Sequence, residues 1–172
     1  VQGEPGAILA IEFAADTREQ VSAVASQLES ELRADGLGYH FPVVWGANVN
    51  RVWNLRKAAL GLLANIPGDA KPVAVIEDTA IDPEDMPAYV REFDEILGRH
   101  GLSAVHYGHA ASGELHLRPI LNLKLEEHHR LFRVIGSEIA KLTKRFGGSL
   151  SGEHGDGRLR GEFLPMMVGK KN

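Results

Sequence analysis

His109 and His116 flank a Ser112-Gly113 pair that is typical of a two-residue β-hairpin loop. With that loop, His109 lies directly opposite His116 on the neighbouring strand. Directly opposed residues have β-carbons roughly 4.5–5.5 Å apart, close enough for two imidazoles to bind one metal ion. The spacing therefore predicts half of a metal site, although two histidines on a solvated sheet face would give the same pattern.

Side chains alternate faces along a strand, so the hairpin divides its residues between a polar face and an apolar face. In the same register Tyr107 lies opposite Arg118, on the face of the two histidines, together with Glu114. The other face is the expected core side and carries Ala104, Leu115, Leu117 and Leu121.

A glycine-rich loop, SGEHGDG at residues 151–157, offers a third ligand for the ion. Its glycines permit the tight backbone geometry that turns a carboxylate inward, and by spacing alone either Glu153 or Asp156 suits. Two histidines and one carboxylate bind zinc, manganese or iron(II) and leave positions for a substrate. The competing interpretation of this loop is an ordinary helix-to-strand turn.

Arg56 falls within the apolar stripe of a helix expected over residues 48–64, four residues after Val52. A cation on a buried face needs an anion, which is either a structural carboxylate or the carboxylate of a ligand. The spacing does not choose between the two. Lys71, at the head of an expected strand, is a second candidate cation or else a solvated strand end.

Capping residues and hydrophobic periodicity indicate the elements that position these side chains. The expected helices run from Thr17 to Gly36, over residues 48–64, from Asp82 to Gly101 and through residues 131–146. The expected strands are Tyr39–Trp45, Lys71–Ile81 and two strands within residues 103–122. We expect an α+β fold, with helices packed on one face of an antiparallel sheet in ferredoxin-like units, in preference to a parallel sheet.

The 172 residues, 44% of them hydrophobic, suit a single domain over residues 1–172. The formal charge of -4, with scattered basic residues, predicts no binding to nucleic acid. Cysteine is absent, which excludes disulfides, thiolate metal sites and a cysteine nucleophile. Neither a transmembrane segment nor a signal peptide is predicted, so the expected location is cytoplasmic, with peripheral association of the full-length protein with the inner membrane left open.

Four stretches between residues 52 and 163 are together specific: VWNLRKAAL, KPVAVIEDTAIDPEDMPAYV, YGHAASGELHLRPILNL and GGSLSGEHGDGRLRGEF. They resemble the C-terminal, or cap, domain of FAD-linked oxidases of the vanillyl-alcohol oxidase superfamily. Within it they are most similar to the group of D-lactate dehydrogenase, the flavin-linked glycolate oxidase and D-2-hydroxyglutarate dehydrogenase. HLRP and GDGRLRGEF resemble large members that fuse the flavin module to an iron–sulfur region. The chain is then expected to be a fragment of that domain, with the iron–sulfur region beyond Asn172.

The resemblance implies a role for each polar residue. His109, His116 and Glu153 would bind a divalent metal, zinc first, with manganese and iron as alternatives. His154 would take the proton from the α-hydroxyl of the substrate as hydride leaves for FAD. Arg56 would hold the substrate carboxylate, and Lys71 would assist it. Arg118 stands where the 2-hydroxyglutarate enzymes have asparagine; the three cations together would suit a carboxylate and a second anionic group.

The implied activity is oxidation of a D-2-hydroxyacid, similar to lactate, glycolate or 2-hydroxyglutarate, to the 2-oxoacid with hydride transfer to FAD. The FAD-binding domain of this family precedes the cap, and nothing in this chain resembles it, so the isolated chain is expected to be inactive. Related enzymes often have GDGNLH between the histidines where this chain has ASGELH, which puts Glu114 in place of an amide.

Two other classes of function fit the same residues. A non-catalytic α+β ligand-binding or regulatory module would leave the histidines as surface residues and pair Arg56 internally. A metal-dependent hydrolase would instead use Glu153 or His154 to activate water.

Overall fold

The structure is a computed structural model that describes residues 2–169. The chain divides into two compact units, Val1–Leu60 and Gly61–Asn172, which are described separately. The single domain expected over residues 1–172 stays a prediction. Within the described residues, no helix combines the length and the apolar character needed to cross a membrane.

The N-terminal unit contains the two helices that the sequence predicts. Helix α1, Arg18–Ala34, begins at a capping box in which the Gln20 backbone N–H donates to the Thr17 hydroxyl and the Thr17 N–H donates to the Gln20 side chain. Helix α2, Val49–Ala64, continues a single 3₁₀ turn at Gly46–Asn48 and runs past the boundary between the units. Both helices are confirmed within two residues of their expected bounds.

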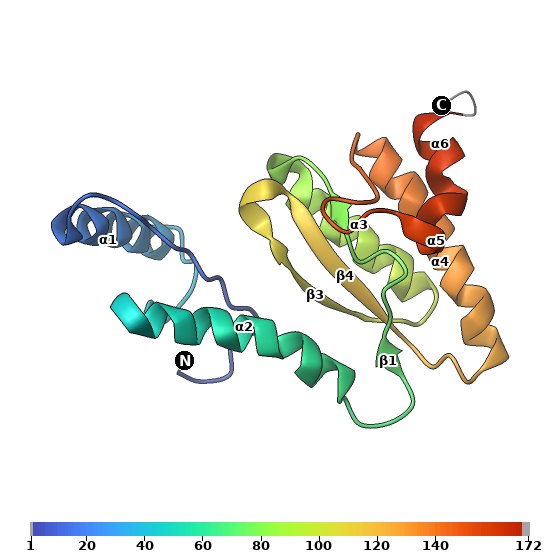
Figure 1. The fold of residues 1–172 in the computed structure, drawn as a ribbon, viewed down its shortest axis with the longest axis horizontal. Helices are drawn as coiled ribbons and strands as arrows, with labels where there is room; N and C mark the ends of the chain where they lie inside the picture. The colour runs from blue at the N-terminus through green and yellow to red at the C-terminus, as the bar shows by residue number, and fades with distance from the viewer. Residues whose placement is uncertain (1, 170–172) are drawn as a thin grey trace. The chain divides into compact units, whose positions relative to one another are not determined.

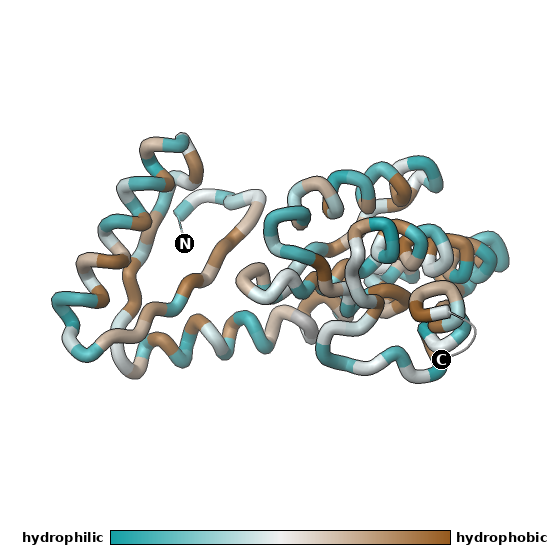
Figure 2. The backbone as a smooth tube through the Cα atoms, turned by 90° about the horizontal axis from the view of Figure 1, so that it is seen from above, coloured by the Kyte–Doolittle hydropathy of each residue, from teal (hydrophilic) through white to brown (hydrophobic). Residues whose placement is uncertain are grey.

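The strand expected over Tyr39–Trp45 does not form. The segment is extended, but no backbone ladder pairs it with another described segment, and the apolar residues 7–14 run without a ladder as well. The prediction is wrong because β-propensity supplies an extended backbone, whereas a strand also requires a partner for its N–H and C=O groups. Figure 2 shows hydrophobic residues in both segments, and Tyr39 and Val43 are exposed.

The C-terminal unit is built around the long strand β4, Glu114–Leu121 (Figure 1). Strand β3, Ala104–His109, pairs along one side of it, and the short strands β1, Lys71–Pro72, and β2, Thr79–Ala80, pair along the other. Every pairing is antiparallel, which confirms the expected α+β fold. Ferredoxin-like units stay a prediction.

The edge formed by β1 and β2 is broken where the sequence predicts one continuous strand over Lys71–Ile81. A turn over residues 75–78 separates the two short strands. Val75 and Ile76 are both buried in the turn, which a strand that sends alternate side chains to opposite faces would not achieve in this sheet. In the turn, the side chains of Glu77 and Asp78 no longer have to alternate between the two faces of the sheet.

Two amphipathic helices cover one face of the sheet. Helix α3, Met86–Arg99, follows a 3₁₀ turn at Pro83–Asp85 in which the Glu84 backbone N–H donates to the Asp82 side chain. Helix α4, Glu126–Arg145, carries the expected apolar stripe. Both pack on the sheet through a core whose fully buried members include Tyr89, Phe93, Leu97, Leu117, Ile135 and Ile139. Packing of helices on one sheet face is thereby confirmed.

The connection between β3 and β4 is longer than the predicted Ser112-Gly113 loop. Residues 110–112 form a 3₁₀ turn that closes at Gly113, whose φ of 73° is left-handed. A β-carbon there would lie 1.8 Å from the Ile81 carbonyl oxygen, so only glycine fits. His109 consequently lies opposite Glu114, and His116 opposite Tyr107. The prediction that His109 directly opposes His116 is wrong by two residues, and the pairing of Tyr107 with Arg118 fails for the same reason.

The loop after α4 returns to the edge of the sheet beside β2. Ser149 and Ala80 exchange two backbone hydrogen bonds of 2.8 and 2.9 Å. The chain then passes through residues 151–156 into the short helices α5, Gly157–Arg160, and α6, Leu164–Val168, which are separated by a 3₁₀ turn at Gly161–Phe163. Pairing with β2 thus delivers the glycine-rich loop to the open face of the sheet.

Candidate metal centre

His116 lies in the middle of β4 on the face that the helices do not cover. Its side chain is only 5% exposed, and its Nδ1 atom lies 2.7 Å from the Glu77 backbone carbonyl oxygen. A carbonyl oxygen only accepts hydrogen bonds, so Nδ1 carries the proton and donates it. Nε2 is therefore the nitrogen that faces the other side chains of the site, an arrangement typical of metal-binding histidines.

His109 and Glu153 bring two further donor atoms to His116. The Glu153 Oε1 atom lies 3.5 Å from His116 Nε2 and 3.9 Å from His109 Nε2. The three donor atoms fall within 4.8 Å of one another, and the two imidazole rings are 5.5 Å apart and nearly perpendicular. Ligands that bind one ion at about 2.0–2.2 Å can be up to roughly 4.4 Å apart, so these donors need little movement to share an ion.

The register error does not separate the two histidines, because a shift of two residues keeps every side chain on its own face. His109 and His116 lie diagonally across the hairpin instead of directly opposite. The ring of Tyr107, which is the direct partner of His116, packs 4.9 Å from the imidazole. The predicted polar face is confirmed, while the pairing within it is corrected.

Asp78 anchors the loop that carries Glu153 and His154. Its carboxylate is fully buried and accepts hydrogen bonds from the Ser151 hydroxyl (2.5 Å), the Glu153 backbone N–H (3.1 Å) and the His154 backbone N–H (2.9 Å). The Gly152 N–H donates to the Asp78 carbonyl oxygen. One residue thus fixes four consecutive positions of the loop, which determines where the Glu153 carboxylate and the His154 imidazole point.

Asp78 is charged at neutral pH, which strengthens the hydrogen bonds that it accepts from the loop. Burial raises the pKa of its carboxyl group, but hydrogen bonds from Ser151 and from the His154 and Glu153 backbone outweigh that effect and hold the pKa at about 2. The guanidinium of Arg160, itself buried, contacts the same carboxylate at 3.4 Å and donates to the Gly155 carbonyl oxygen at 2.6 Å. Asp78 is therefore an anion at neutral pH.

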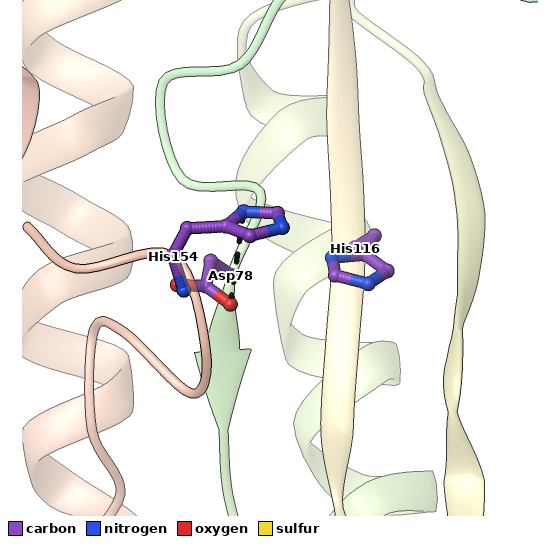
Figure 3. A group of neighbouring side chains, drawn as sticks. All are labelled: Asp78, His116 and His154. Atoms are coloured by element: carbon purple, nitrogen blue, oxygen red, sulfur yellow. Dashed lines mark hydrogen bonds and ion pairs between the residues drawn. The ribbon is translucent and has the colours of Figure 1, made fainter. Parts of the chain in front are cut away.

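His154 stands beside the three donors. Figure 3 shows it on the glycine-rich loop, next to Asp78 and across from His116 on β4. The rings of His154 and His116 are stacked 5.3 Å apart, and His154 Nε2 lies 3.4 Å from Glu153 Oε1. Its Nδ1 atom is 3.9 Å from a carboxylate oxygen of Glu77 and from one of Asp78. The imidazole can accept a proton beside the donor cluster while two carboxylates face its far nitrogen.

The site combines a buried floor with an exposed rim. The floor consists of His116, Asp78 and Glu114, all of which are buried. The rim consists of His109, Glu153 and His154, whose side chains are 44–48% exposed. Donors fixed from below and reachable from above allow a small molecule to approach the same point as an ion.

Glu114 adds a second acid to the floor. Its Oε1 atom lies 3.7 Å from His116 Nε2 and has no hydrogen-bond partner among the described residues. Burial raises the pKa of this carboxyl group, a side-chain hydrogen bond with Asp78 raises it further, and the charges of Glu153 and Asp78 add to the effect. A cation at the site would favour the charged form.

The three predicted substrate-binding cations lie in different places. Arg118 follows His116 by two residues on the same strand face and forms an ion pair with Glu77, with both side chains less than one-fifth exposed. Lys71 pairs with Leu121, on the sheet face opposite to that of His116, and its ammonium group donates to the Ile66 carbonyl oxygen. Arg56 is half-buried on α2 in the N-terminal unit. Of the two cations in the C-terminal unit, Arg118 lies on the face of the histidines and Lys71 does not.

Sequence reasoning missed Asp78, Glu77 and Arg160. Glu77 and Asp78 lie in the run KPVAVIEDTAI, whose composition predicts an ordinary strand. The available signal was two consecutive acids in an apolar run, because a buried strand would have to bury one of them on each face. Arg160 lies in a segment without periodicity and carries no comparable signal.

Known proteins resemble this chain over nearly its whole length. The family described as FAD linked oxidases, C-terminal domain, matches residues 2–172. The chain belongs to this family. Among its relatives, the D-2-hydroxyglutarate dehydrogenase of Pseudomonas putida is 38% identical over 157 residues, which cover 91% of this chain and 15% of the relative. The enzyme of the same name from Escherichia coli K12 is 36% identical over 170 residues, 94% of this chain and 16% of the relative.

A less similar relative also matches. The glycolate oxidase subunit GlcD of Bacillus subtilis is 26% identical over 116 residues, which cover 67% of this chain and 24% of that protein. The resemblance drawn from the four sequence stretches is thereby confirmed at the level of the family and of the group named. The chain spans 15–16% of the length of the D-2-hydroxyglutarate dehydrogenases compared above.

Proposed function

We propose that this chain is the metal- and substrate-binding part of a flavin-dependent dehydrogenase that oxidises a D-2-hydroxyacid to the 2-oxoacid. The observation that carries the proposal is the convergence of donor atoms from His109, His116 and Glu153 in a chain of the FAD-linked oxidase family. The D-2-hydroxyglutarate dehydrogenases among its relatives favour a substrate with a second carboxylate.

The proposed ion is held by the imidazoles of His109 and His116 and by the carboxylate of Glu153. These donors fit zinc first, and manganese or iron(II) as alternatives. When bound, the ion would lower the pKa of the substrate hydroxyl group and FAD would accept the hydride. The hydrogen bond from His116 Nδ1 to the Glu77 backbone supports a ligand role, since it occupies Nδ1 and leaves Nε2 as the nitrogen that would bind the ion.

We propose His154 as the catalytic base that takes the hydroxyl proton. Its Nε2 atom is 3.4 Å from a carboxylate oxygen of Glu153, so a hydroxyl group beside the proposed ligands lies within its reach. The carboxylates of Glu77 and Asp78 face Nδ1 and would stabilise the imidazolium that forms. An imidazole suits proton removal near neutral pH.

Arg118 is the proposed contact for a substrate carboxylate, because it lies on the site face and two residues from His116. Its existing ion pair with Glu77 holds the guanidinium in place and leaves further N–H donors for a ligand. Arg56 and Lys71 stay proposals that rest on their sequence motifs. For Lys71, a substrate role requires the side chain to leave the Ile66 carbonyl oxygen.

The remaining expectations concern the intact protein. We propose that it carries an FAD-binding domain and an iron–sulfur region, that this chain alone is inactive, and that the enzyme works in the cytoplasm or at the inner membrane surface. These proposals rest on the resemblance to large members of the family.

The test uses the intact protein that carries this chain. Yellow, flavin-loaded enzyme should reduce a dye with D-2-hydroxyglutarate or another D-2-hydroxyacid and not with the L-enantiomers. His154→Gln should lower kcat by about 10²–10⁴-fold, whereas His106→Gln, which changes an exposed histidine paired with Asp94, should leave kcat within twofold. A colourless hydrolase, or full activity in His154→Gln, would overturn the proposal.

A further inference from the structure

Glu114 places a second carboxylate beside the donors of the candidate metal centre. The residue is 8% exposed, and its Oε1 atom lacks a hydrogen-bond partner among the described residues. A buried carboxylate oxygen without a donor or cation is unfavourable. The carboxyl group of Glu114 hydrogen-bonds with Asp78, so it is the unpartnered Oε1 atom that requires an explanation.

The distances of Glu153 and Glu114 from His116 offer an explanation for the unpartnered Oε1 atom. His116 Nε2 lies 3.5 Å from the Glu153 carboxylate and 3.7 Å from the Glu114 carboxylate. Both separations are below the roughly 4.4 Å that two ligands of one ion can span. Each acid is therefore within bonding range of an ion that His116 also binds.

The loop above Glu114 is shaped to admit its side chain. A β-carbon at Gly152 would lie 3.0 Å from Glu114 Cγ, so a larger residue in the loop would press on the carboxylate. The nearby guanidinium groups are engaged by other acids, since Arg118 pairs with Glu77 and Arg160 contacts Asp78. The described contacts thus leave the Glu114 Oε1 atom directed at the donor cluster.

We propose that Glu114 is a fourth protein ligand of the metal, so that this chain offers two imidazoles and two carboxylates to one ion. The inference rests on the proposed metal-binding function and deepens it. Two carboxylates balance the charge of a divalent ion. Four protein donors fill a tetrahedral site, so an ion that also accepts substrate would be five- or six-coordinate, which manganese or iron(II) adopts more readily than zinc.

The test measures cobalt binding to the intact, chelator-stripped protein. We compare wild type with Glu114→Gln, which keeps the shape of the side chain. The control is Asp94→Asn, which removes the charge of Asp94 on α3 from its ion pair with His106 on β3, outside the site. His116→Ala reports whether the site binds metal at all. The readouts are Co²⁺ affinity, the electron paramagnetic resonance spectrum of bound Co²⁺, in which oxidised flavin is silent, and circular dichroism for folding.

A fourth ligand predicts that Glu114→Gln loses more than about 100-fold in Co²⁺ affinity, beyond the 10–100-fold typical of groups that only support a ligand, and that the spectrum of the residual bound ion changes. Asp94→Asn should match wild type. If His116→Ala abolishes Co²⁺ binding but the spectrum of Glu114→Gln is unchanged, Glu114 is not a ligand and the inference is overturned, whether or not Glu114→Gln binds more weakly. Equal binding by wild type and His116→Ala would instead overturn the metal site itself. Should Glu114→Gln fail to fold, Glu114→Asp provides the same comparison, with an altered spectrum expected.

Discussion

His116 directs its Nδ1 atom at the backbone carbonyl oxygen of Glu77, 2.7 Å away, which leaves Nε2 as the nitrogen that faces Glu153. The carbonyl comes from the turn that splits the edge of the sheet. A backbone feature, independent of the side chain at position 77, therefore sets the tautomer of the central histidine in the candidate metal centre.

The tautomer is directly testable in the metal-free protein. We expect ¹⁵N chemical shifts of labelled histidine to show His116 with its proton on Nδ1, because the Glu77 carbonyl oxygen can only accept a hydrogen bond. Addition of zinc should shift the Nε2 resonance and leave the Nδ1 proton in place. A His116 signal with the proton on Nε2 would contradict the geometry.

Asp78 should matter for stability more than any exposed acid. Asp78→Asn puts an amide NH₂ group among the donors of Ser151, Glu153 and His154, so at least one buried N–H loses its acceptor. We expect the free energy of unfolding to fall by about 2–3 kcal/mol. Asp94→Asn, in an exposed pair, should stay within about 0.5 kcal/mol of wild type. Chemical denaturation of both variants gives the comparison.

Acid should remove the contribution of Asp78. The pKa of this carboxyl group is about 2 in the folded protein against 3.8 as its ordinary value. A lowered pKa means that the stabilisation is complete above pH 4 and is lost as the pH falls towards 2, a change of about 2 kcal/mol. The difference in unfolding free energy between wild type and Asp78→Asn should therefore shrink over this range. A difference that stays constant from pH 6 to pH 2 would show that the ionised carboxylate is not the source.

Gly113 sets the hairpin that aligns His109 with the floor of the site. Gly113→Ala adds a β-carbon 1.8 Å from the Ile81 carbonyl oxygen at a left-handed φ, so we expect a loss of about 3 kcal/mol or more in unfolding free energy. Gly98→Ala is the matched control, because it is an exposed helical glycine with no neighbour within 4 Å. That variant should be more stable by about 0.5–1 kcal/mol. Equal effects of the two substitutions would argue against the hairpin geometry.

The elements with a strong local signal could be predicted from the sequence. Helices α1, α3 and α4 follow from caps, apolar periodicity and terminal glycines, which act over a few neighbouring residues. The hairpin was assigned to the right segment, but its register depends on a 3₁₀ turn that is tied to Ile81, a residue more than 30 positions away. The strand at Tyr39–Trp45 failed because pairing requires a partner that local propensity does not supply.

Some residues of the candidate site could also be predicted from the sequence, and others could not. His109 and His116 could be predicted to share a face because face alternation survives a register shift of two residues. The choice of Glu153 over Asp156 came only from the family resemblance and stays a prediction. Asp78 could not be assigned, since its role depends on a turn inside an apparent strand and on a loop 73 residues further along the chain. Proposed ligands can be found from sequence motifs. Asp78 cannot, because it holds the loop largely through backbone N–H groups, which every residue except proline provides.

The metal content of the intact protein tests the central claim most directly. Wild type, Glu153→Gln and Asp156→Asn are dialysed against trace zinc and measured by mass spectrometry for bound metal, the last being an acid of the same loop that contacts Arg160. The proposed ligand set predicts about one ion per chain in wild type and in Asp156→Asn, and at least a tenfold loss in Glu153→Gln. Equal metal in wild type and Glu153→Gln, or no metal in any of the three, would contradict it.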